Sequence, residues 1–258
     1  MKVTVCQLDP RDESRDAHIA FLAEHIQANK SDFLLLPEMC FSPWLAAEQI
    51  PDSKKWQAAV LQHQAYIDRL TEFGVDGVLG TRPTSGTGER GHNAAYLWDR
   101  ASGEATNVHQ KYYLPNEPGY WEAEWYDRGD KSFDTVGFAD LNIGIQICTE
   151  MWYFEWARHF ARQGAELLCV PRATPHESTG KWLAGGRTAA VCAGAYCLSS
   201  NLWCPPGDTA NCGGLGWVID PEGEVMARTD EDNPFATVEI DPGFARASKI
   251  TYPRYVEE

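Results

Sequence analysis

Three polar residues follow apolar segments of the chain and are of the types that perform covalent catalysis. Glu38 follows the segment FLLLP, Lys111 lies in VHQKYYLP, and Cys148 follows the alternating segment LNIGIQI. A thiol can attack a carbonyl or nitrile carbon, a carboxylate can accept its proton, and an ammonium can stabilise the negative oxygen that forms. Because ligands bind at the carboxyl ends of strands in open α/β sheets, these positions indicate one hydrolytic site.

Each of the three residues also has an ordinary structural interpretation. A lone cysteine at a strand end is commonly a small buried hydrophobe, a glutamate after a proline is commonly a turn residue, and most lysines lie at the surface. A turn from strand to helix would instead expose the Cys148 sulfur and direct backbone N–H groups at it, which favours the thiolate. The residues alone leave both interpretations open.

Apolar residues recur with strand and helix periods in alternation along the chain. The period-two pattern and the turn signals predict strands at 3–7, 32–36, 74–82, 93–99, 141–147, 164–173, 195–201, 213–220 and 235–241. The helical period predicts helices at 14–29, 54–73, 152–163 and 186–195. This order is typical of layered α/β folds, and since no Ser/Gly linker or repeat interrupts it, we expect residues 1–258 to form one domain.

The composition narrows the class of ligand. A formal net charge of −15 disfavours nucleic acids and anionic membranes as partners, so we expect a small-molecule substrate. The sequence has neither the closely paired cysteines of a zinc site nor an HExxH segment, and we expect no metal or other cofactor.

The N-terminal segment MKVTVCQLDPRDE lacks the apolar stretch of a secretory signal, which predicts a cytoplasmic protein. In such a protein we expect most of the eight cysteines to be small buried hydrophobes.

The segments around the three residues resemble the nitrilase superfamily of carbon–nitrogen hydrolases. They are PEMCFSPW, HQKYYLPNEPGYWE and GIQICTEMWYFEWARHFARQGAELL, and they occur in the family's order of Glu, Lys, Cys. The segments VTVCQLDP, HNAAYLWDRASGE and LGWVIDPEGEVMA extend the resemblance over nearly the whole chain. It implies a four-layer α-β-β-α sandwich in which Glu38, Lys111 and Cys148 meet between the ends of two sheets. It also implies a homodimer or a larger homo-oligomer.

The resemblance implies two further site residues. The KxxLxxE spacing places Glu117 after Lys111, as in family members whose second glutamate orients the substrate or assists proton transfer. The backbone N–H of Thr149, together with Lys111, is expected to hold the negative oxygen of the tetrahedral adduct.

Two other residues are candidates for contact with the substrate. Arg172 stands in VPRATPHE where relatives commonly carry a small residue, and an arginine that faces the pocket could bind a substrate carboxylate. A structural salt bridge to one of the many acidic residues explains Arg172 equally well. Trp44 belongs to a group of tryptophans flanking the site, most of which we expect to be core.

The predicted activity is hydrolysis of an amide or N-carbamoyl group through a thioester on Cys148, with release of ammonia or an amine. A nitrilase is the alternative within the family, although Thr149-Glu150 follow the cysteine where many nitrilases resemble Cys-Trp-Glu. A catalytically silent binding subunit is a second alternative. A cysteine peptidase or thioesterase is a third, and it would need His109, His159 or His176 beside Cys148. The sequence leaves the substrate undetermined.

Overall fold

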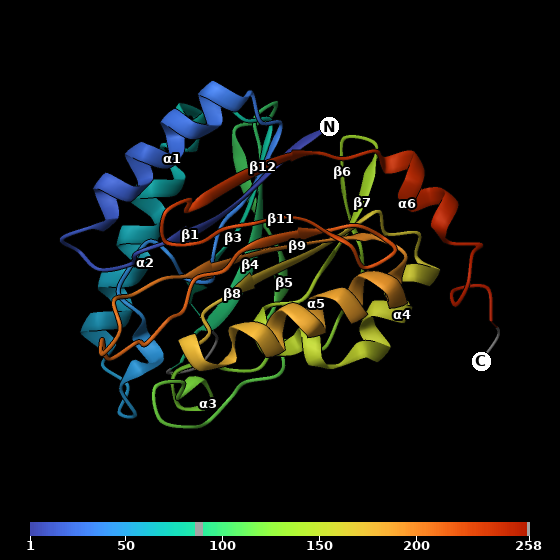
Figure 1. Cartoon of the computed structure of the whole chain (residues 1–258). Coiled ribbons are helices and arrows are strands. Elements are labelled where there is room, and N and C mark those ends of the chain that lie inside the picture. The colour runs from blue at the N-terminus through green and yellow to red at the C-terminus, as the bar shows by residue number, and fades with distance from the viewer. Residues whose placement is uncertain (86–89, 257–258) are drawn as a thin grey trace.

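The computed structural model describes residues 1–85 and 90–256, which build two β-sheets packed face to face between helices (Figure 1). The first sheet contains, in spatial order, β12 (Phe235–Glu239), β1 (Lys2–Leu8), β2 (Phe33–Leu35), β3 (Gly77–Thr84), β4 (His92–Asp99) and β5 (Glu104–Gln110). Strands β1, β2 and β3 are parallel, whereas β4, β5 and β12 pair antiparallel with their neighbours. Parallel β1 to β3 therefore end at the same edge.

The second sheet has the same organisation. It contains, in spatial order, β6 (Val136–Phe138), β7 (Leu141–Ile145), β8 (Leu167–Arg172), β9 (Tyr196–Leu202), β10 (Trp217–Ile219) and β11 (Val225–Arg228). Its central strands β7, β8 and β9 are parallel, and its outer strands are antiparallel.

Strand β1 belongs to both sheets. Its first half pairs with β2 and β12, while Gln7 and Leu8 pair with Asn201 and Leu202 of β9. A single strand thus joins the sheets along one side, which fixes how their edges align.

Helices cover the outer face of each sheet. The helices α1 (Arg15–Asn29) and α2 (Ser53–Ile67) contact the first sheet, and α4 (Phe154–Arg162) and α5 (Thr179–Ala193) lie over the second (Figure 1). The short helices are α3 (Glu122–Trp125), α6 (Pro242–Ser248) and 3₁₀ turns at Leu45–Ala47, Leu70–Phe73, Cys148–Trp152 and His176–Ser178. The predicted α/β class and four-layer α-β-β-α sandwich are confirmed. None of the described helices is long and apolar enough to cross a bilayer.

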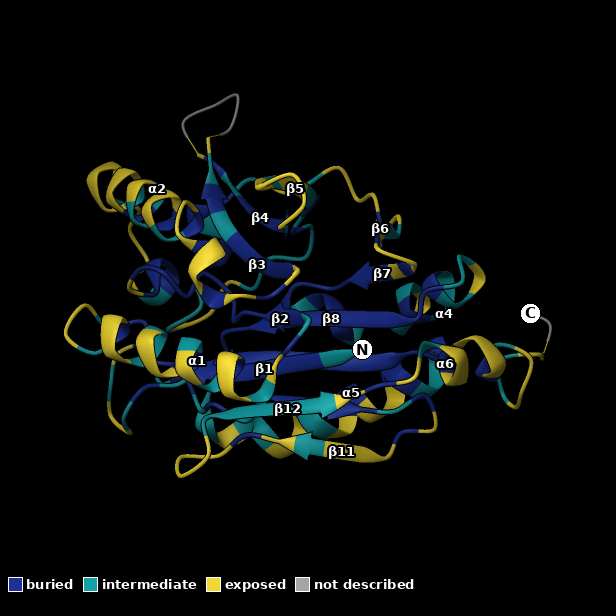
Figure 2. Cartoon of the chain, turned by 90° about the horizontal axis from the view of Figure 1, so that it is seen from above, coloured by how far each residue is buried: buried dark blue, intermediate teal, exposed yellow. Residues whose placement is uncertain are grey.

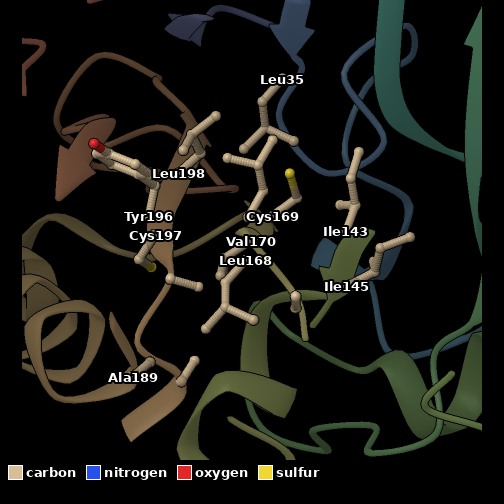
Figure 3. Packing of buried hydrophobic residues seen from close by; sticks show 14 of the residues in the cluster. Leu35, Ile143, Ile145, Leu168, Cys169, Val170, Ala189, Tyr196, Cys197 and Leu198 are labelled. Carbon is tan, nitrogen blue, oxygen red and sulfur yellow. The ribbon is translucent and has the colours of Figure 1, made fainter. Parts of the chain in front are cut away.

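Alternate side chains of the strands point into different apolar layers. In β2, Phe33 and Leu35 join the cluster between the sheets, whereas Leu34 and the following Leu36 join the cluster beneath α1 and α2. The successive residues of a strand face opposite sides, so one short segment serves both layers. Figure 3 shows Leu35 among β7, β8 and β9 side chains, and Figure 2 shows the central strands buried and the helices exposed on their outer faces.

Several elements differ from the sequence prediction. The helix expected at 186–195 begins at Thr179, and the helix expected at 54–73 ends at Ile67 before a 3₁₀ turn. Strands β5, β6 and β11 and helix α6 were not predicted. In β11 most side chains are exposed, so its sequence lacks the alternation of apolar and polar residues from which a strand is predicted.

Candidate active site

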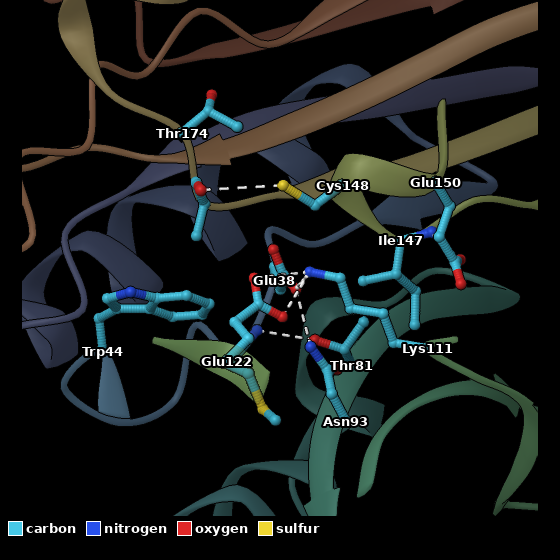
Figure 4. Close-up of polar contacts among 12 residues, drawn as sticks. Glu38, Trp44, Thr81, Asn93, Lys111, Glu122, Ile147, Cys148, Glu150 and Thr174 are labelled. Carbon is cyan, nitrogen blue, oxygen red and sulfur yellow. Dashed lines mark hydrogen bonds and ion pairs between the residues drawn. The ribbon is translucent and has the colours of Figure 1, made fainter. Parts of the chain in front are cut away.

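Glu38, Lys111 and Cys148 lie together, as the sequence predicts, although they come from different strands. Glu38 follows β2, Lys111 follows β5, and Cys148 begins the 3₁₀ turn after β7. All three are buried, and the Lys111 Nζ atom lies 2.7 Å from Glu38 Oε1. Figure 4 shows the Cys148 sulfur above the Glu38 and Lys111 side chains.

A cavity of about 370 Å³ reaches Cys148 from the surface. Cys148 is only 3% exposed and lies at its buried end, and Thr149 is part of its wall. The cavity is at the small end of the range for ligand pockets. It therefore suits a small molecule.

Lys111 lies between two carboxylates. Its Nζ donates to Glu38 Oε1 at 2.7 Å and to Glu122 Oε1 at 2.7 Å. Asn93 Nδ2 also donates to Glu38 Oε1, at 2.7 Å. The other oxygen, Glu38 Oε2, is buried and has no hydrogen-bond partner among the described residues. One Glu38 oxygen is therefore held in place while the second is available to a proton donor.

The second carboxylate that contacts the lysine is that of Glu122, whereas Glu117 lies at the mouth of the cavity, where its predicted role in orienting the substrate stays a prediction. Glu117 is exposed at the mouth of the cavity, and its backbone bonds reciprocally with Tyr120 in a turn. That turn directs the chain into α3, which begins with Glu122 and carries its carboxylate back to Lys111. The sequence offers no periodic signal in this loop that could choose between the two glutamates.

Burial and charge set the protonation of this cluster. Burial, and secondarily the Glu38 charge, raises the pKa of Cys148 above its ordinary value. Burial would lower the pKa of Lys111, but the charges of Glu122 and Glu38 raise it. Burial raises the pKa of Glu122 to about 8, against the opposing effect of Lys111. At neutral pH the resting site thus holds a thiol and an ammonium.

Local backbone conformation presents the cysteine to the cavity. Cys148 has φ of 51°, in the left-handed region that non-glycine residues rarely adopt. Its sulfur faces the Ala173 carbonyl oxygen at 3.8 Å. Met39, beside Glu38, has the same φ of 51°, and its N–H donates to Thr81 Oγ1 at 2.7 Å. Glu38 and Cys148 therefore both lie at sharp turns, shortly after the ends of β2 and β7.

Glu150 connects the lysine segment to the cysteine turn, and the sequence analysis missed it. Its Oε1 accepts from the N–H of Tyr112, next to the lysine, at 2.8 Å. Its Oε2 accepts from the N–H of Ile147, next to the cysteine, at 2.7 Å, and lies 2.7 Å from His109 Nε2. Burial would lower the pKa of His109, but the Glu150 charge raises it. The carboxylate thus bridges two elements from opposite sheets.

Arg172 does not face the cavity and forms no salt bridge within residues 1–85 and 90–256, so both interpretations of it are wrong. It is fully buried, and its guanidinium donates to Ser199 Oγ, Thr174 Oγ1 and the Leu215 carbonyl oxygen at 2.6–2.7 Å. It stacks 4.0 Å from the Trp217 ring centroid. Burial lowers its pKa to about 9. The sequence identified an unusual arginine but not its neutral surroundings.

Trp44 also lacks the predicted contact with the substrate cavity. Its Nε1 donates to the Gly119 carbonyl oxygen at 3.0 Å, and its ring lines a different cavity, next to Pro43 and Leu45. It packs against the loop that carries Glu117 and does not line the Cys148 cavity.

The histidines of the peptidase alternative have other partners. His109 bonds to Glu150, His159 to Gln163, and His176 to the Cys204 carbonyl oxygen. No group of three His, Cys, Asp or Glu side chains in the described part of the chain is arranged to hold a metal ion.

Comparison with known sequences identifies relatives of this chain. Residues 2–250 match the carbon-nitrogen hydrolase family. A citrullinase of Francisella tularensis subsp. tularensis is 26% identical over 258 residues, which cover 93% of this chain and 89% of the relative. An N-carbamoylputrescine amidase of Solanum lycopersicum is 36% identical over 86 residues, 33% of this chain and 28% of the relative.

Comparison with solved structures gives the same fold. A carbon-nitrogen hydrolase of Helicobacter pylori G27 superposes with a TM-score of 0.81 at 20% identity, covering 99% of this chain and 94% of the other. A variant of the amidase from Nesterenkonia sp. AN1 superposes with a TM-score of 0.74 at 19% identity, covering 96% and 92%. In it the acetamide moiety of fluoroacetamide is attached covalently at the active-site cysteine. The family match across the chain and the shared fold establish that this protein belongs to the carbon–nitrogen hydrolase family, the nitrilase superfamily.

Proposed function

We propose that this protein hydrolyses the amide or N-carbamoyl group of a small molecule through a thioester on Cys148. The main support is the Glu38 carboxylate, which lies below the thiol and whose buried Oε2 atom has no hydrogen-bond partner in the described part of the chain (Figure 4). Because the Cys148 pKa is raised, the thiol must lose its proton to a base during attack. Glu38 is the carboxylate placed to accept it.

The first half-reaction forms the acyl-enzyme. The Cys148 sulfur attacks the carbonyl carbon while Glu38 Oε2 accepts the thiol proton, and the carbonyl electron pair moves to oxygen. Lys111 and the Thr149 N–H stabilise that oxygen. The Thr149 N–H is suited to this because the first N–H groups of a helical turn lack intrahelical acceptors. Protonated Glu38 then gives its proton to the leaving nitrogen, the C–N bond breaks, and ammonia or an amine departs.

The second half-reaction releases the acid. Glu38, again ionised, removes a proton from a water molecule, whose oxygen attacks the thioester carbon. The C–S bond breaks and Glu38 returns the proton to sulfur, so one water is consumed for each C–N bond cleaved. Lys111 keeps its contact with Glu38 throughout because Glu122 holds it from the other side.

The names of the relatives support an amide or ureido substrate group. The two curated relatives are named for citrulline and N-carbamoylputrescine, which both carry a ureido group, and the Nesterenkonia protein is named an amidase. Each of these groups has a carbonyl carbon bonded to nitrogen and suits the same attack by sulfur. A nitrile also suits it, and nitriles therefore belong in the test below.

The test of this proposal is to follow ammonia release from a panel of small amides, ureido compounds and nitriles. Glu38→Gln should slow turnover by about a hundredfold or more, because its amide cannot accept the thiol proton. Intact-protein mass spectrometry of the wild type, quenched with acid during turnover, should show an acyl adduct that is absent from Cys148→Ala. Full activity in Cys148→Ala would falsify the proposal.

A catalytically silent subunit is distinguished by thiol reactivity. Iodoacetamide at neutral pH should modify Cys148 before the other buried cysteines, because Cys148 lines an open cavity and has Glu38 beside it as a general base (Figure 4). Cys148 alkylation no faster than that of Cys169, which is fully buried, would favour the silent subunit.

A further inference from the structure

The cavity at Cys148 changes character with depth. Its inner end is formed by buried residues, Cys148 and Glu122 among them. Its middle is lined by the half-buried aromatic rings of Tyr120 and Trp152. Its outer end carries the exposed side chains of Glu117 and Lys181. A ligand that reaches the sulfur must therefore pass an apolar zone and end between two charges.

The two outer charges have opposite sign and come from separate elements. Glu117 lies in the loop before α3, where the Tyr120 N–H donates to its carbonyl oxygen at 2.8 Å. Lys181 lies in the first turn of α5. Within residues 1–85 and 90–256 neither side chain forms an ion pair, and they do not pair with each other. Both charges are thus available to a ligand in the cavity.

We propose that the substrate carries an ammonium and a carboxylate at the end remote from the reacting group, as an α-amino acid does. The ammonium would lie against Glu117, the carboxylate against Lys181, and a short methylene chain between the aromatic walls. This inference rests on the proposed function, because it assumes that the amide or ureido end of the molecule reaches Cys148.

Charge complementarity favours a zwitterion over a singly charged substrate. An anion attracted by Lys181 would meet Glu117 as a like charge, and a cation attracted by Glu117 would meet Lys181 in the same way. A neutral molecule would leave both charges without a partner. Arg172 offers no alternative carboxylate site, because its guanidinium is buried behind the cavity on Ser199, Thr174 and Leu215.

The experiment uses four ureido compounds that share a propyl chain: propylurea, 4-ureidobutyrate, 3-aminopropylurea and citrulline. They are neutral, anionic, cationic and zwitterionic at the remote end, and a parallel amide series runs from butyramide to glutamine. The full chain should show its lowest KM for the zwitterion in whichever series reacts. Lys181→Met and Glu117→Gln should each raise that KM by roughly three- to tenfold, as for a partly exposed charge pair.

Two matched control variants separate this effect from a general change in surface charge. Lys54→Met removes an exposed lysine from the first turn of α2, and Glu24→Gln removes an exposed carboxylate from α1. Both should leave KM for citrulline or glutamine unchanged. Added salt should raise KM for the zwitterion more than for the neutral compound.

Binding to Cys148→Ala, measured by calorimetry, distinguishes failure of this inference from failure of the proposed function. Tighter binding of the zwitterion than of the neutral compound, weakened by Lys181→Met and by Glu117→Gln, supports the inference even if no compound turns over. Equal affinity for all four remote ends overturns it, even if the neutral compound is hydrolysed rapidly.

Discussion

At the scale of single residues, the site depends on one ammonium placed between two buried carboxylates. Lys111 contacts Glu38 and Glu122, so removal of either side chain still leaves it one carboxyl partner. Each carboxyl has one oxygen without a hydrogen-bond partner among the described residues, but Glu122 Oε2 lies 2.6 Å from Lys111 Nζ, whereas Lys111 contacts Glu38 through Oε1. The proposed roles therefore differ: Glu38 transfers the proton, and Glu122 positions the lysine.

The raised pKa of Glu122 predicts a pH dependence of stability. Its carboxyl has an ordinary pKa of 4.5 and a folded pKa of about 8, so between these values the folded state holds a proton that the unfolded state has lost. The resulting stabilisation is complete below the ordinary pKa and is lost as the pH rises to about 8. Urea unfolding from about pH 5 to about pH 8 should show the wild type losing stability relative to Glu122→Gln. Parallel pH curves for the two proteins would contradict the assignment.

Because Arg172 is buried on neutral partners, its substitution is expected to lower the stability of the fold and not to change substrate recognition. Arg172→Leu leaves Thr174 Oγ1 and the Leu215 carbonyl oxygen without their donor, and should lower the free energy of unfolding by about 2–4 kcal/mol. Arg69→Leu, at an exposed i,i+3 pair with Glu72, should change it by less than about 1 kcal/mol. Denaturant unfolding measures both changes.

The same Arg172→Leu variant separates the buried arginine from a carboxylate-binding one. Any loss of activity should be equal for 4-ureidobutyrate and propylurea, because the side chain does not reach the cavity. A rise in KM confined to carboxylate-bearing compounds would return Arg172 to the substrate site.

At the scale of elements, the site is assembled at the ends of strands and held by side chains that cross between them. The turn at Cys148 follows β7 in one sheet, and Lys111 follows β5 in the other. Glu150 accepts backbone N–H groups from both segments and is supported by His109. A shift of either strand would therefore break a hydrogen bond to a charged group.

Glu150→Gln tests this bridge. Its single amide oxygen cannot replace both carboxylate oxygens, and its NH2 group would face an N–H donor. We expect a loss of about 2 kcal/mol or more in unfolding free energy and a fall in kcat of about tenfold or more, with a smaller change in KM. The exposed Glu155→Gln in α4 is the matched control. Unaltered kcat in Glu150→Gln would mean that the bridge does not position the catalytic groups.

At the scale of the whole molecule, the distance between the sheets controls whether the two halves of the site meet. Gly77 of β3 lies against Phe138 of β6, and a Cβ atom at Gly77 would be 2.3 Å from Phe138 Cζ. Phe138 is buried and packs on Phe33 with ring centroids 5.3 Å apart. The absence of a side chain at Gly77 thus allows close sheet packing.

Gly77→Ala is expected to force the sheets to adjust. Overpacking of this kind should cost about 1–3 kcal/mol in unfolding free energy, measured by denaturant titration. Gly137→Ala is a close control, since a Cβ atom there would meet nothing within 4 Å. If both variants unfold at the same denaturant concentration, inter-sheet packing at Gly77 is not limiting.

The sequence by itself determined the class of fold and three residues of the candidate site. Strand segments such as Phe33–Leu35 and Leu141–Ile145 have apolar patterns from which the strands can be predicted locally, and Glu38 and Cys148 follow them closely. The motifs around these residues and Lys111 carried the family resemblance.

Tertiary structure alone decided which other side chains reach the site. The loop from Lys111 to α3 has no periodic pattern, so only its folded path brings Glu122 to the lysine and leaves Glu117 at the mouth. The surroundings of Arg172 are assembled from Ser199 and Leu215, distant in sequence, which no local pattern connects to it. Whether a polar side chain is buried, and which groups it hydrogen-bonds to, depends on contacts between segments distant in sequence. These contacts exist only once the two sheets have packed.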